Sequence, residues 1–346
     1  MKALVVGCGS IGKRHLRNLR SVGVTDLYAF DPRPDRMKEA SDQSGCKPCR
    51  TLEEGLDRAP QLAVIATPNS FHMQPALAAA RRGCHLFIEK PLSHSMEGVK
   101  ELLAEVKTRK LAALIGCNMR FHPGVALTME LAKEGAIGRI VCTRVMAGSY
   151  LPEWHPWEDY RQGYSARADL GGGVILDGIH EIDYLLDLLG PVQSVTCEAG
   201  RCGNVETQTE NTAEILVWSK TGALANIHLD YVQRAYRRSC LLTGTEGTLE
   251  WDFHIPRVRL FRAASKTWEE YPLPYGEVNA MYIAQARHLL ACIEGRESPA
   301  QDIEAASKAL QVAIAAKESA RTGRRIQLDD PSAKKTVRKR NGTRRP

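Results

Sequence analysis

The sequence predicts an α/β plus α+β architecture, in which a doubly wound parallel sheet is followed by a large, mostly antiparallel open sheet. Three observations support this prediction. A glycine-rich turn follows the first apolar strand, short apolar strands alternate with helical stretches over the first third of the chain, and the second half consists mainly of strands. With 346 residues, of which 43% are hydrophobic, the chain is long enough to form two cores.

The first strand is Ala3–Val6, and it runs directly into the sequence Gly-Cys-Gly-Ser-Ile-Gly at residues 7–12. A helical stretch follows from Lys13 to Val22. A strand, a glycine turn and a helix in this order are typical of the Rossmann dinucleotide-binding unit. The sequence therefore predicts a nucleotide cofactor near the start of the chain.

The glycines of this turn each have an expected function. Gly7 permits the tight turn, Gly9 lets the backbone approach a pyrophosphate, and Gly12 allows the helix to pack closely on the strand. The N-terminus of the helix attracts phosphate groups. We therefore expect the three glycines, together with Ser10 and Ile11, to bind the cofactor.

The second strand, Asp26–Phe30, is followed by Asp31, about 20 residues beyond the glycine turn, where a Rossmann unit places an acid against the adenosine ribose. A carboxylate there bonds a free 2′-hydroxyl and repels a 2′-phosphate, so NAD is the favoured cofactor. Arg33 and Arg36 are close in sequence, and either could turn toward a phosphate. NADP therefore stays an alternative, and Arg33 is counted among the cofactor residues.

A third strand, Leu62–Ala66, is apolar throughout, as a buried parallel strand should be. Loops at the carboxyl ends of such strands line the ligand crevice. The alternative is a simple turn before a helix over Met73–Arg82, with Asn69 as its cap. The cofactor residues expected in this loop are Thr67, Pro68, Asn69 and His72.

A further strand, His85–Ile88, leads to the tripeptide Glu89-Lys90-Pro91. A lysine at the end of a buried strand and beside a nucleotide site is a candidate acid, base or electrophile. This position suggests a redox enzyme, with Lys90 at the reacting centre and Glu89 next to the cofactor.

The alternation of strand and helix ends after one more strand, Leu111–Cys117. Asn118 follows it and is expected to contact the cofactor, while Arg120 is expected to contact the substrate. A helix over Gly124–Glu134 and a strand over Ile140–Ala147 come next. We therefore place the end of the Rossmann domain at residue 121.

The second half predicts an open antiparallel sheet that carries helices. Apolar and polar residues alternate from Ala225 to Tyr231, as in a sheet with one face turned to solvent or to a partner. Two helices follow, Ala280–Glu294 and Asp302–Thr322, and Gly323 stops the second. The strands expected here are Val195–Ala199, Thr212–Trp218, Ala223–Val232, Arg238–Thr243, Thr248–Phe253 and Val258–Arg262. A substrate and oligomerisation domain over 122–330 and a disordered tail over 331–346 complete the chain.

The segment Trp154–Arg167 is the most polar and aromatic of the chain and predicts a substrate pocket loop. Aromatic faces suit sugar rings and bases, and arginine suits phosphate or carboxylate. The alternative is an irregular loop folded on its own aromatic residues. The substrate residues expected in it are Trp154, Tyr160, Arg161, Tyr164 and Arg167.

Three glycines at 171–173 precede an apolar stretch in which Asp177, His180 and Asp183 recur every three residues. On one helix these side chains would share a stripe. A histidine paired with Asp177 could be a general base whose basicity the carboxylate raises. The alternative is a histidine that only makes a structural hydrogen bond. We predict that His180 is catalytic and contacts the substrate.

The formal net charge of +7 lies in the tail, because residues 333–346 carry seven basic residues and no acidic ones. Such a segment is too polar to fold by itself, and no specific nucleic-acid binding is expected.

The ten cysteines are scattered, and Cys46–Cys49 lacks the second pair of a zinc site, so no metal is expected. No apolar run approaches the roughly 20 residues of a membrane helix. We expect a soluble, cytoplasmic protein.

The chain resembles the Gfo/Idh/MocA oxidoreductase family over roughly residues 1–328. The motifs that carry the resemblance are the glycine turn at 7–12, Thr67-Pro68-Asn69 with His72, Glu89-Lys90-Pro91, and the glycines at 171–173 followed by an aspartate and His180. Members of this family oxidise or reduce a carbon of a sugar, an inositol or a nucleotide sugar with NAD(P). They combine a Rossmann domain with an open-sheet domain through which many of them oligomerise. The resemblance thus implies a sugar or nucleotide-sugar substrate and a homo-oligomer, dimer or tetramer.

By this resemblance, Lys90 corresponds to the family's lysine near the substrate hydroxyl and the nicotinamide, with a cis bond before Pro91. His180 corresponds to its acid/base histidine, and Asp177 to the partner of that histidine. The family commonly places the aspartate four residues before the histidine, whereas here the spacing is three. The segment 154–167 looks more like members acting on sugars of surface polysaccharides. An inositol or free-sugar dehydrogenase and a non-catalytic dinucleotide-binding regulator are the alternatives.

Overall fold

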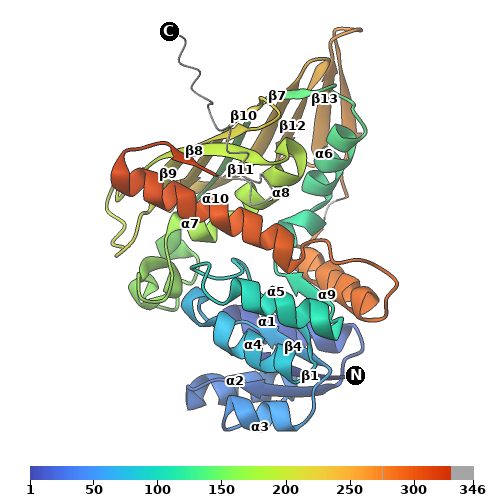
Figure 1. Cartoon of the computed structure of the whole chain (residues 1–346), viewed down its shortest axis with the longest axis vertical. Helices are drawn as coiled ribbons and strands as arrows, with labels where there is room; N and C mark the ends of the chain where they lie inside the picture. Colours follow the sequence, from blue (N-terminus) through green and yellow to red (C-terminus); the bar gives the residue numbers. More distant parts are fainter. Residues whose placement is uncertain (275, 329–346) are drawn as a thin grey trace, which may run out of the picture.

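The computed structural model describes residues 1–274 and 276–328, and Figure 1 shows two sheets stacked along the long axis of the molecule. The first sheet has six parallel strands in the order β3-β2-β1-β4-β5-β6. Its strands are β1 (Lys2–Val6), β2 (Asp26–Phe30), β3 (Lys47–Pro48), β4 (Leu62–Ile65), β5 (His85–Ile88) and β6 (Ala113–Ile115). The predicted doubly wound parallel sheet is confirmed. The predicted tail, 331–346, lies outside the described residues.

Five helices connect these strands. They are α1 (Ser10–Ser21), α2 (Pro34–Ser44), α3 (Leu52–Asp57), α4 (Met73–Arg81) and α5 (Val99–Arg109), with short 3-10 turns η1 (Asn69–Phe71) and η2 (Asn118–Phe121). The strands are apolar in unbroken runs because both faces of the sheet are covered. In β1, for example, Leu4 and Val6 belong to one core and Ala3 and Val5 to the core on the opposite face.

The second sheet has nine strands in the order β14-β13-β12-β11-β7-β10-β9-β8-β15. Neighbouring strands are antiparallel except for β7 and β10, which are parallel, so the predicted, mostly antiparallel sheet is confirmed. The strands are β7 (Ile140–Tyr150), β8 (Val192–Gly200), β9 (Thr212–Ser219), β10 (Leu224–Asp230), β11 (Val232–Gly244), β12 (Gly247–Asp252), β13 (Arg257–Arg262), β14 (Thr267–Pro272) and β15 (Ile326–Gln327).

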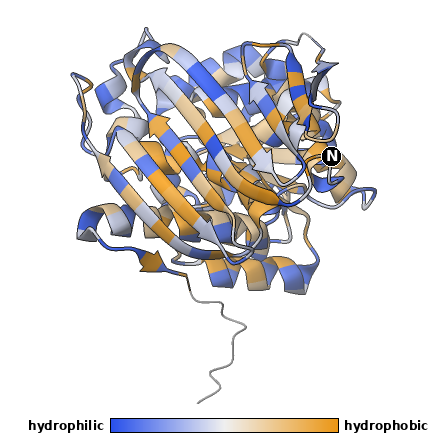
Figure 2. Cartoon of the chain, turned by 90° about the horizontal axis from the view of Figure 1, so that it is seen from above, coloured by the Kyte–Doolittle hydropathy of each residue, from blue (hydrophilic) through white to orange (hydrophobic). Residues whose placement is uncertain are grey.

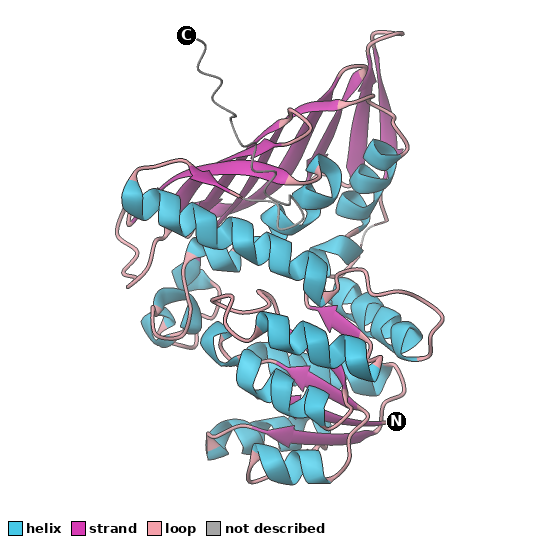
Figure 3. Ribbon diagram, in the orientation of Figure 1, coloured by secondary structure: helices cyan, strands magenta, loops and turns pink. Residues whose placement is uncertain are grey.

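Helices cover one face of the second sheet, as Figure 3 shows. They are α6 (Pro123–Lys133), α7 (Val174–Asp177), α8 (Ile179–Leu189) and α10 (Ile303–Thr322), and short turns η3 (Leu151–Glu153), η4 (Tyr160–Gln162) and η5 (Tyr164–Ala166) precede α7. The other face is seen from above in Figure 2, where strands lie uncovered with apolar and polar residues interspersed. In β9, Ile215 and Val217 point inward, while Leu216 and Trp218 are each 43% exposed. The sheet is therefore open on that side.

The chain reverses direction at Tyr231, between two strands that lie on opposite sides of β7. The strand before it, β10, is parallel to β7, and the strand after it, β11, is antiparallel to β7. The sequence predicted a single strand over Ala223–Val232, which would run through this reversal. The reversal places Tyr231, which is 1% exposed, under the sheet and close to α7.

Helix α9 (Asn279–Ile293) comes from the second half of the chain but packs on the first sheet. Its Leu289 belongs to the core that contains Ala3 and Val5, and Asn279 exchanges two hydrogen bonds with Asn18 of α1. The two parts of the molecule thus share a continuous contact. No helix within residues 1–274 and 276–328 is long and apolar enough to cross a membrane.

Candidate active site

The glycine turn leaves space that fits a dinucleotide. A Cβ on Gly7 would lie 2.5 Å from the carbonyl oxygen of Ala66, and one on Gly12 would lie 1.9 Å from the carbonyl oxygen of Gly7. A Cβ on Gly9 would meet nothing closer than 3.9 Å. Helix α1 begins at Ser10 with no side-chain cap, so its first N–H groups face this open space. Gly7 and Gly12 are therefore required by packing, while the space before Gly9 suits a pyrophosphate.

Asp31 lies at the carboxyl end of β2 and faces this turn. Its carboxylate accepts hydrogen bonds from the backbone N–H groups of Cys8 at 2.8 Å and Arg33 at 2.9 Å, which fix its orientation. The guanidinium of Arg33 pairs instead with Asp35, 2.5 Å away. The guanidinium of Arg36 lies nearer the turn, 3.9 Å from where a Cβ on Gly9 would be. Of the two arginines, Arg36 is thus the better placed to meet a cofactor phosphate.

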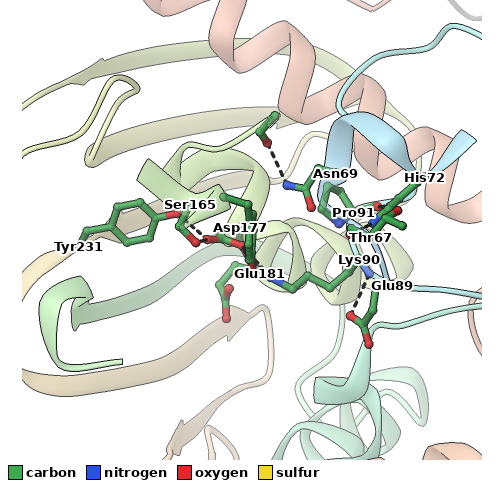
Figure 4. A network of polar contacts seen from close by, with 12 residues as sticks. Thr67, Asn69, His72, Glu89, Lys90, Pro91, Ser165, Asp177, Glu181 and Tyr231 are labelled. Atoms are coloured by element: carbon green, nitrogen blue, oxygen red, sulfur yellow. Dashed lines mark hydrogen bonds and ion pairs between the residues drawn. The ribbon is translucent and has the colours of Figure 1, made fainter. Parts of the chain in front are cut away.

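The loop after β4 joins the two parts of the molecule (Figure 4). Asn69 does not cap α4, because its amide donates a 2.9 Å hydrogen bond to the carbonyl oxygen of Gly171. His72 is fully buried, with its ring nitrogens 2.9 Å from the carbonyl oxygens of Thr67 and Pro91. His72 therefore holds two loops together. The hydroxyl of Thr67, which precedes Pro68, is buried without a hydrogen-bond partner among the described residues.

The side chains of the two residues before Pro91, Glu89 and Lys90, point in different directions and have different partners. The carboxylate of Glu89 is buried and accepts hydrogen bonds from His15 and from the backbone N–H of Lys90, so it is engaged within the protein. The side chain of Lys90 extends the other way, toward the second part of the molecule (Figure 4). The Lys90–Pro91 peptide bond is cis, as expected.

Lys90 meets Asp177, the last residue of α7, and this pair is the centre of the site. The ammonium of Lys90 donates to the Asp177 carboxylate at 2.9 Å and to its carbonyl oxygen at 3.1 Å. Three hydroxyls donate to the same carboxylate: Tyr164 at 2.7 Å, Ser165 at 2.5 Å and Tyr231 at 2.6 Å. The carboxylate thus accepts from four side chains, of which Tyr164 and Ser165 share η5 while Lys90 and Tyr231 come from other segments.

The environment of the Lys90–Asp177 pair favours the charged form of both side chains. Burial by itself disfavours the ammonium, but the nearby Asp177 carboxylate outweighs it and raises the pKa of Lys90 above its ordinary value of 10.5. Burial likewise disfavours the carboxylate, yet Lys90 and the hydroxyl donors lower the pKa of Asp177 below its ordinary value of 3.8. Lys90 is therefore a fixed hydrogen-bond donor.

His180 lies beside this pair but is not bonded to Asp177, so the predicted pairing of the two is wrong. The helix is interrupted at Gly178, between α7 and α8, and a Cβ at this position would lie 2.6 Å from a methyl group of Leu229, so glycine is required there. His180 is 6% exposed, and its Nδ1 has no partner among the described residues. Burial and the nearby cations Lys90 and Arg238 lower the pKa of His180 well below 6.5. Its imidazole is neutral.

Two other buried charge pairs stabilise α8. Arg120 donates to Asp183 at 2.6 Å and to Asp187 at 2.7 Å, so this predicted substrate residue instead ties η2 to α8. Arg238 of β11 donates to both oxygens of Glu181, at 2.7 Å and 3.1 Å. Asp183, the third residue of the predicted stripe, thus pairs with Arg120 and does not face the reacting centre.

Only part of the segment 154–167 reaches the site. Trp154 lines the pocket and donates to the hydroxyl of Ser149 at 2.9 Å, and Tyr164 bonds Asp177. The other three predicted substrate residues are engaged elsewhere. Tyr160 accepts from the backbone of Glu206, Arg161 pairs with Asp159 and Glu206, and Arg167 pairs with Asp169.

A pocket of about 580 Å³ lies between the two parts of the molecule. Lys90 and Asn118 line it from the first part, and Asp177, His180 and Trp154 line it from the second. Sequence reasoning missed several further residues of its wall, which come from β7, β11 and α9: Tyr150, Arg234, Tyr236, Arg238 and Tyr282. They carry no motif, because their positions depend on the reversal after β10 and on the packing of α9. The geometry combines a charged donor, a neutral imidazole and an aromatic wall.

Comparison with known proteins gives two family matches. A family model described as "Oxidoreductase family, NAD-binding Rossmann fold" matches residues 1–117, and one described as "GFO/IDH/MocA C-terminal domain" matches residues 125–250. Among curated proteins, the chain is 26% identical over 348 residues to a myo-inositol 2-dehydrogenase of Thermotoga maritima, covering 95% of this chain and 99% of that protein.

Solved structures share the fold over nearly the whole chain. A levoglucosan dehydrogenase in complex with NADH and levoglucosan superposes with a TM-score of 0.85 at 19% identity, covering 95% of this chain and all of that one. The WlbA dehydrogenase of Bordetella pertussis, in complex with NADH and UDP-GlcNAcA, superposes with a TM-score of 0.79 at 22% identity, covering 95% of this chain and 99% of that one.

Proposed function

Because the chain belongs to the Gfo/Idh/MocA family of NAD-binding oxidoreductases, we propose that it is an NAD-dependent dehydrogenase of a sugar, inositol or nucleotide-sugar ring. It would oxidise a ring hydroxyl to a ketone or catalyse the reverse reduction. The single observation that carries this proposal is that a charged Lys90 and a neutral His180 line one pocket beside the nucleotide site. Two titratable groups driven in opposite directions by their surroundings are typical of an acid and a base.

In this proposal, NAD supplies the hydride acceptor when it is bound. The ammonium of Lys90 donates a hydrogen bond to the substrate oxygen and stabilises the negative charge that develops there as the hydroxyl loses its proton. The neutral imidazole of His180 accepts that proton at a ring nitrogen. Asp177 touches neither the substrate nor the proton, but it holds Lys90 charged and in place.

The pocket wall supports a ring substrate with several hydroxyls. Trp154, Tyr150 and Tyr236 offer aromatic faces of the kind on which sugar rings pack, and Asn118 adds hydrogen-bonding capacity. The named relatives act on inositol or bind sugars and a nucleotide sugar. The proposed substrate class is therefore cyclic polyols, free or linked to a nucleotide.

We also propose that the protein is cytoplasmic and forms a homo-oligomer through the open face of the second sheet. All ten cysteines are unpaired, which fits a reducing compartment. The open face exposes Leu216, Trp218 and Leu224, each to more than a third. A second copy of the chain would remove these side chains from water.

The decisive experiment measures NADH formation with NAD and a panel of inositols, free sugars and nucleotide sugars. The variant Lys90→Ala should lower turnover by about 100- to 10,000-fold, the range typical of a lost acid/base or charge-stabilising group, while NAD binding measured by calorimetry persists. Undiminished turnover in Lys90→Ala would exclude the assigned chemistry. NAD binding without turnover on any substrate of the panel would favour the alternative, a dinucleotide-binding regulator.

A further inference from the structure

A second buried pair, His15 and Glu89, lies behind the reacting centre. Ring atom Nε2 of His15 is 2.6 Å from Oε1 of Glu89, and the two residues are only 6% and 7% exposed. With Glu89 as a carboxylate, which can only accept, the proton of this hydrogen bond is assigned to Nε2 of His15. Neither side chain lines the pocket, so the proposed chemistry does not use them directly.

The carboxylate of Glu89 is held on both sides, and one side is the backbone of Lys90. Its Oε2 accepts from the N–H of Lys90 at 3.2 Å, while Oε1 is occupied by His15. Gly116 gives the carboxylate room, since a Cβ there would lie 3.0 Å from Oε2. The base of the lysine is thus fixed through Glu89, while its tip is fixed by Asp177.

His15 connects this arrangement to the cofactor helix. It lies on α1, whose N-terminus at Ser10 faces the expected pyrophosphate position. The same helix contacts α9, because the guanidinium of Arg14 lies 4.6 Å from the ring of Tyr282, a residue of the pocket wall. The ring of His15 packs edge-on against Phe87 at 4.7 Å, which limits its freedom to turn.

We propose that His15 is a positioning residue that acts through Glu89 to hold Lys90 in its reactive place, and so joins the cofactor helix to the reacting centre. Removing the His15 hydrogen bond frees Glu89 to rotate and loosens the backbone at Lys90. A small displacement of a reacting group costs up to about 100-fold in rate, so the effect should appear in kcat. The glycine turn is untouched, so binding of NAD should change little.

The test compares His15→Leu with His15→Gln, whose amide can still donate to Glu89. We expect His15→Leu to lower kcat by about 10- to 100-fold with KM for NAD within about twofold, and His15→Gln to recover most of the loss. His85→Leu is the matched control, because it removes a histidine hydrogen bond, to the N–H of Ala112, at the opposite end of β5. Its kcat should stay at the wild-type value.

This inference rests on the proposed function, so a second readout is needed that requires no substrate. Acetylation of Lys90 by acetic anhydride, followed by mass spectrometry in the presence of NAD, reports how firmly the amine is held. It should be faster in His15→Leu than in wild type, His15→Gln and His85→Leu. Equal acetylation in all four proteins overturns the inference, as does an equal loss of kcat in both His15 variants. Absence of turnover in wild type, by contrast, refutes only the proposed function.

Discussion

At the scale of single residues, the site favours the protonated form of one group and the deprotonated form of its neighbour. Lys90 is held as an ammonium by Asp177, and the same ammonium helps to keep His180 neutral. Asp177 is satisfied by four donors and has no bond to His180. In the proposed chemistry, His180 can accept a proton because burial and the nearby cations keep its ring deprotonated, and not because a carboxylate raises its basicity.

The pH dependence of oxidation should reflect this arrangement. A base works in its deprotonated form, and a pKa lowered below 6.5 keeps His180 deprotonated as the pH falls through that value. A pKa raised above 10.5 keeps Lys90 protonated in the alkaline range. We therefore expect kcat/KM to stay level between about pH 6.5 and pH 10. His180→Ala should remove the acid limb, and an acid limb centred above about pH 7 in wild type would contradict the assignment.

The stability of the fold should also depend on the charged pair. Asp177→Asn keeps the shape of the side chain but leaves the Lys90 ammonium without its counter-charge. We expect the free energy of unfolding, measured by urea denaturation, to fall by about 3–5 kcal/mol. Asp169→Asn is the control, because Asp169 pairs with Arg167 at an exposed site, where a pair contributes about 0–1 kcal/mol. Similar losses in both variants would show that the buried pair contributes no more to stability than an exposed pair does.

At the scale of elements, local signals predicted the nucleotide site, and contacts between distant segments determined the rest. The strand, glycine turn and helix from Lys2 to Ser21 could be read directly, because their sequence pattern lies in consecutive residues. The partner of Asp177 could not, because Lys90 is 87 positions away. The need for glycine at position 178 depends on Leu229, which comes from β10. A helical stripe at three-residue spacing therefore indicated a pairing that the fold does not form.

The glycines at 171–173 show how closely the segments of the site are packed. A Cβ on Gly172 would lie 2.2 Å from the carbonyl oxygen of Tyr164 and 2.6 Å from that of Ser165. Gly172→Ala should therefore displace the turn that carries two of the donors to Asp177, lowering both kcat and the melting temperature, at a cost of about 1–3 kcal/mol. Gly200→Ala, where nothing lies within 4 Å, should melt as wild type does. An unchanged Gly172→Ala protein would show that the turn tolerates a shift.

At the scale of the whole molecule, the two faces of the second sheet differ in what they contact. Its covered face carries α8 and Tyr231 at the site, and its open face exposes Leu216, Trp218 and Leu224. The alternation of apolar and polar residues in β10 predicted that one face would be turned to solvent or a partner. No local pattern distinguishes between solvent and a partner on that face.

The open face should determine the state of association. Light scattering coupled to size-exclusion chromatography should give a multiple of the 38.3 kDa chain mass for wild type and a smaller species for Trp218→Glu, since association would bury the new charge. Trp157→Glu is the control, because Trp157 is 73% exposed in the loop before η4 and belongs to no strand of the sheet. A monomeric wild type, or an equal change in both variants, would exclude this face as the interface.

The Lys90–Asp177 pair also constrains how the molecule can open. Lys90 follows a strand of the first sheet, and Asp177 ends a helix under the second, so the pair spans the boundary between the two parts. Moving the parts apart to exchange the dinucleotide would separate two opposite charges that are only 17% and 3% exposed, unless water enters with the motion. Any motion that moves the two parts away from each other would therefore have to break the same ion pair that holds Lys90 in place.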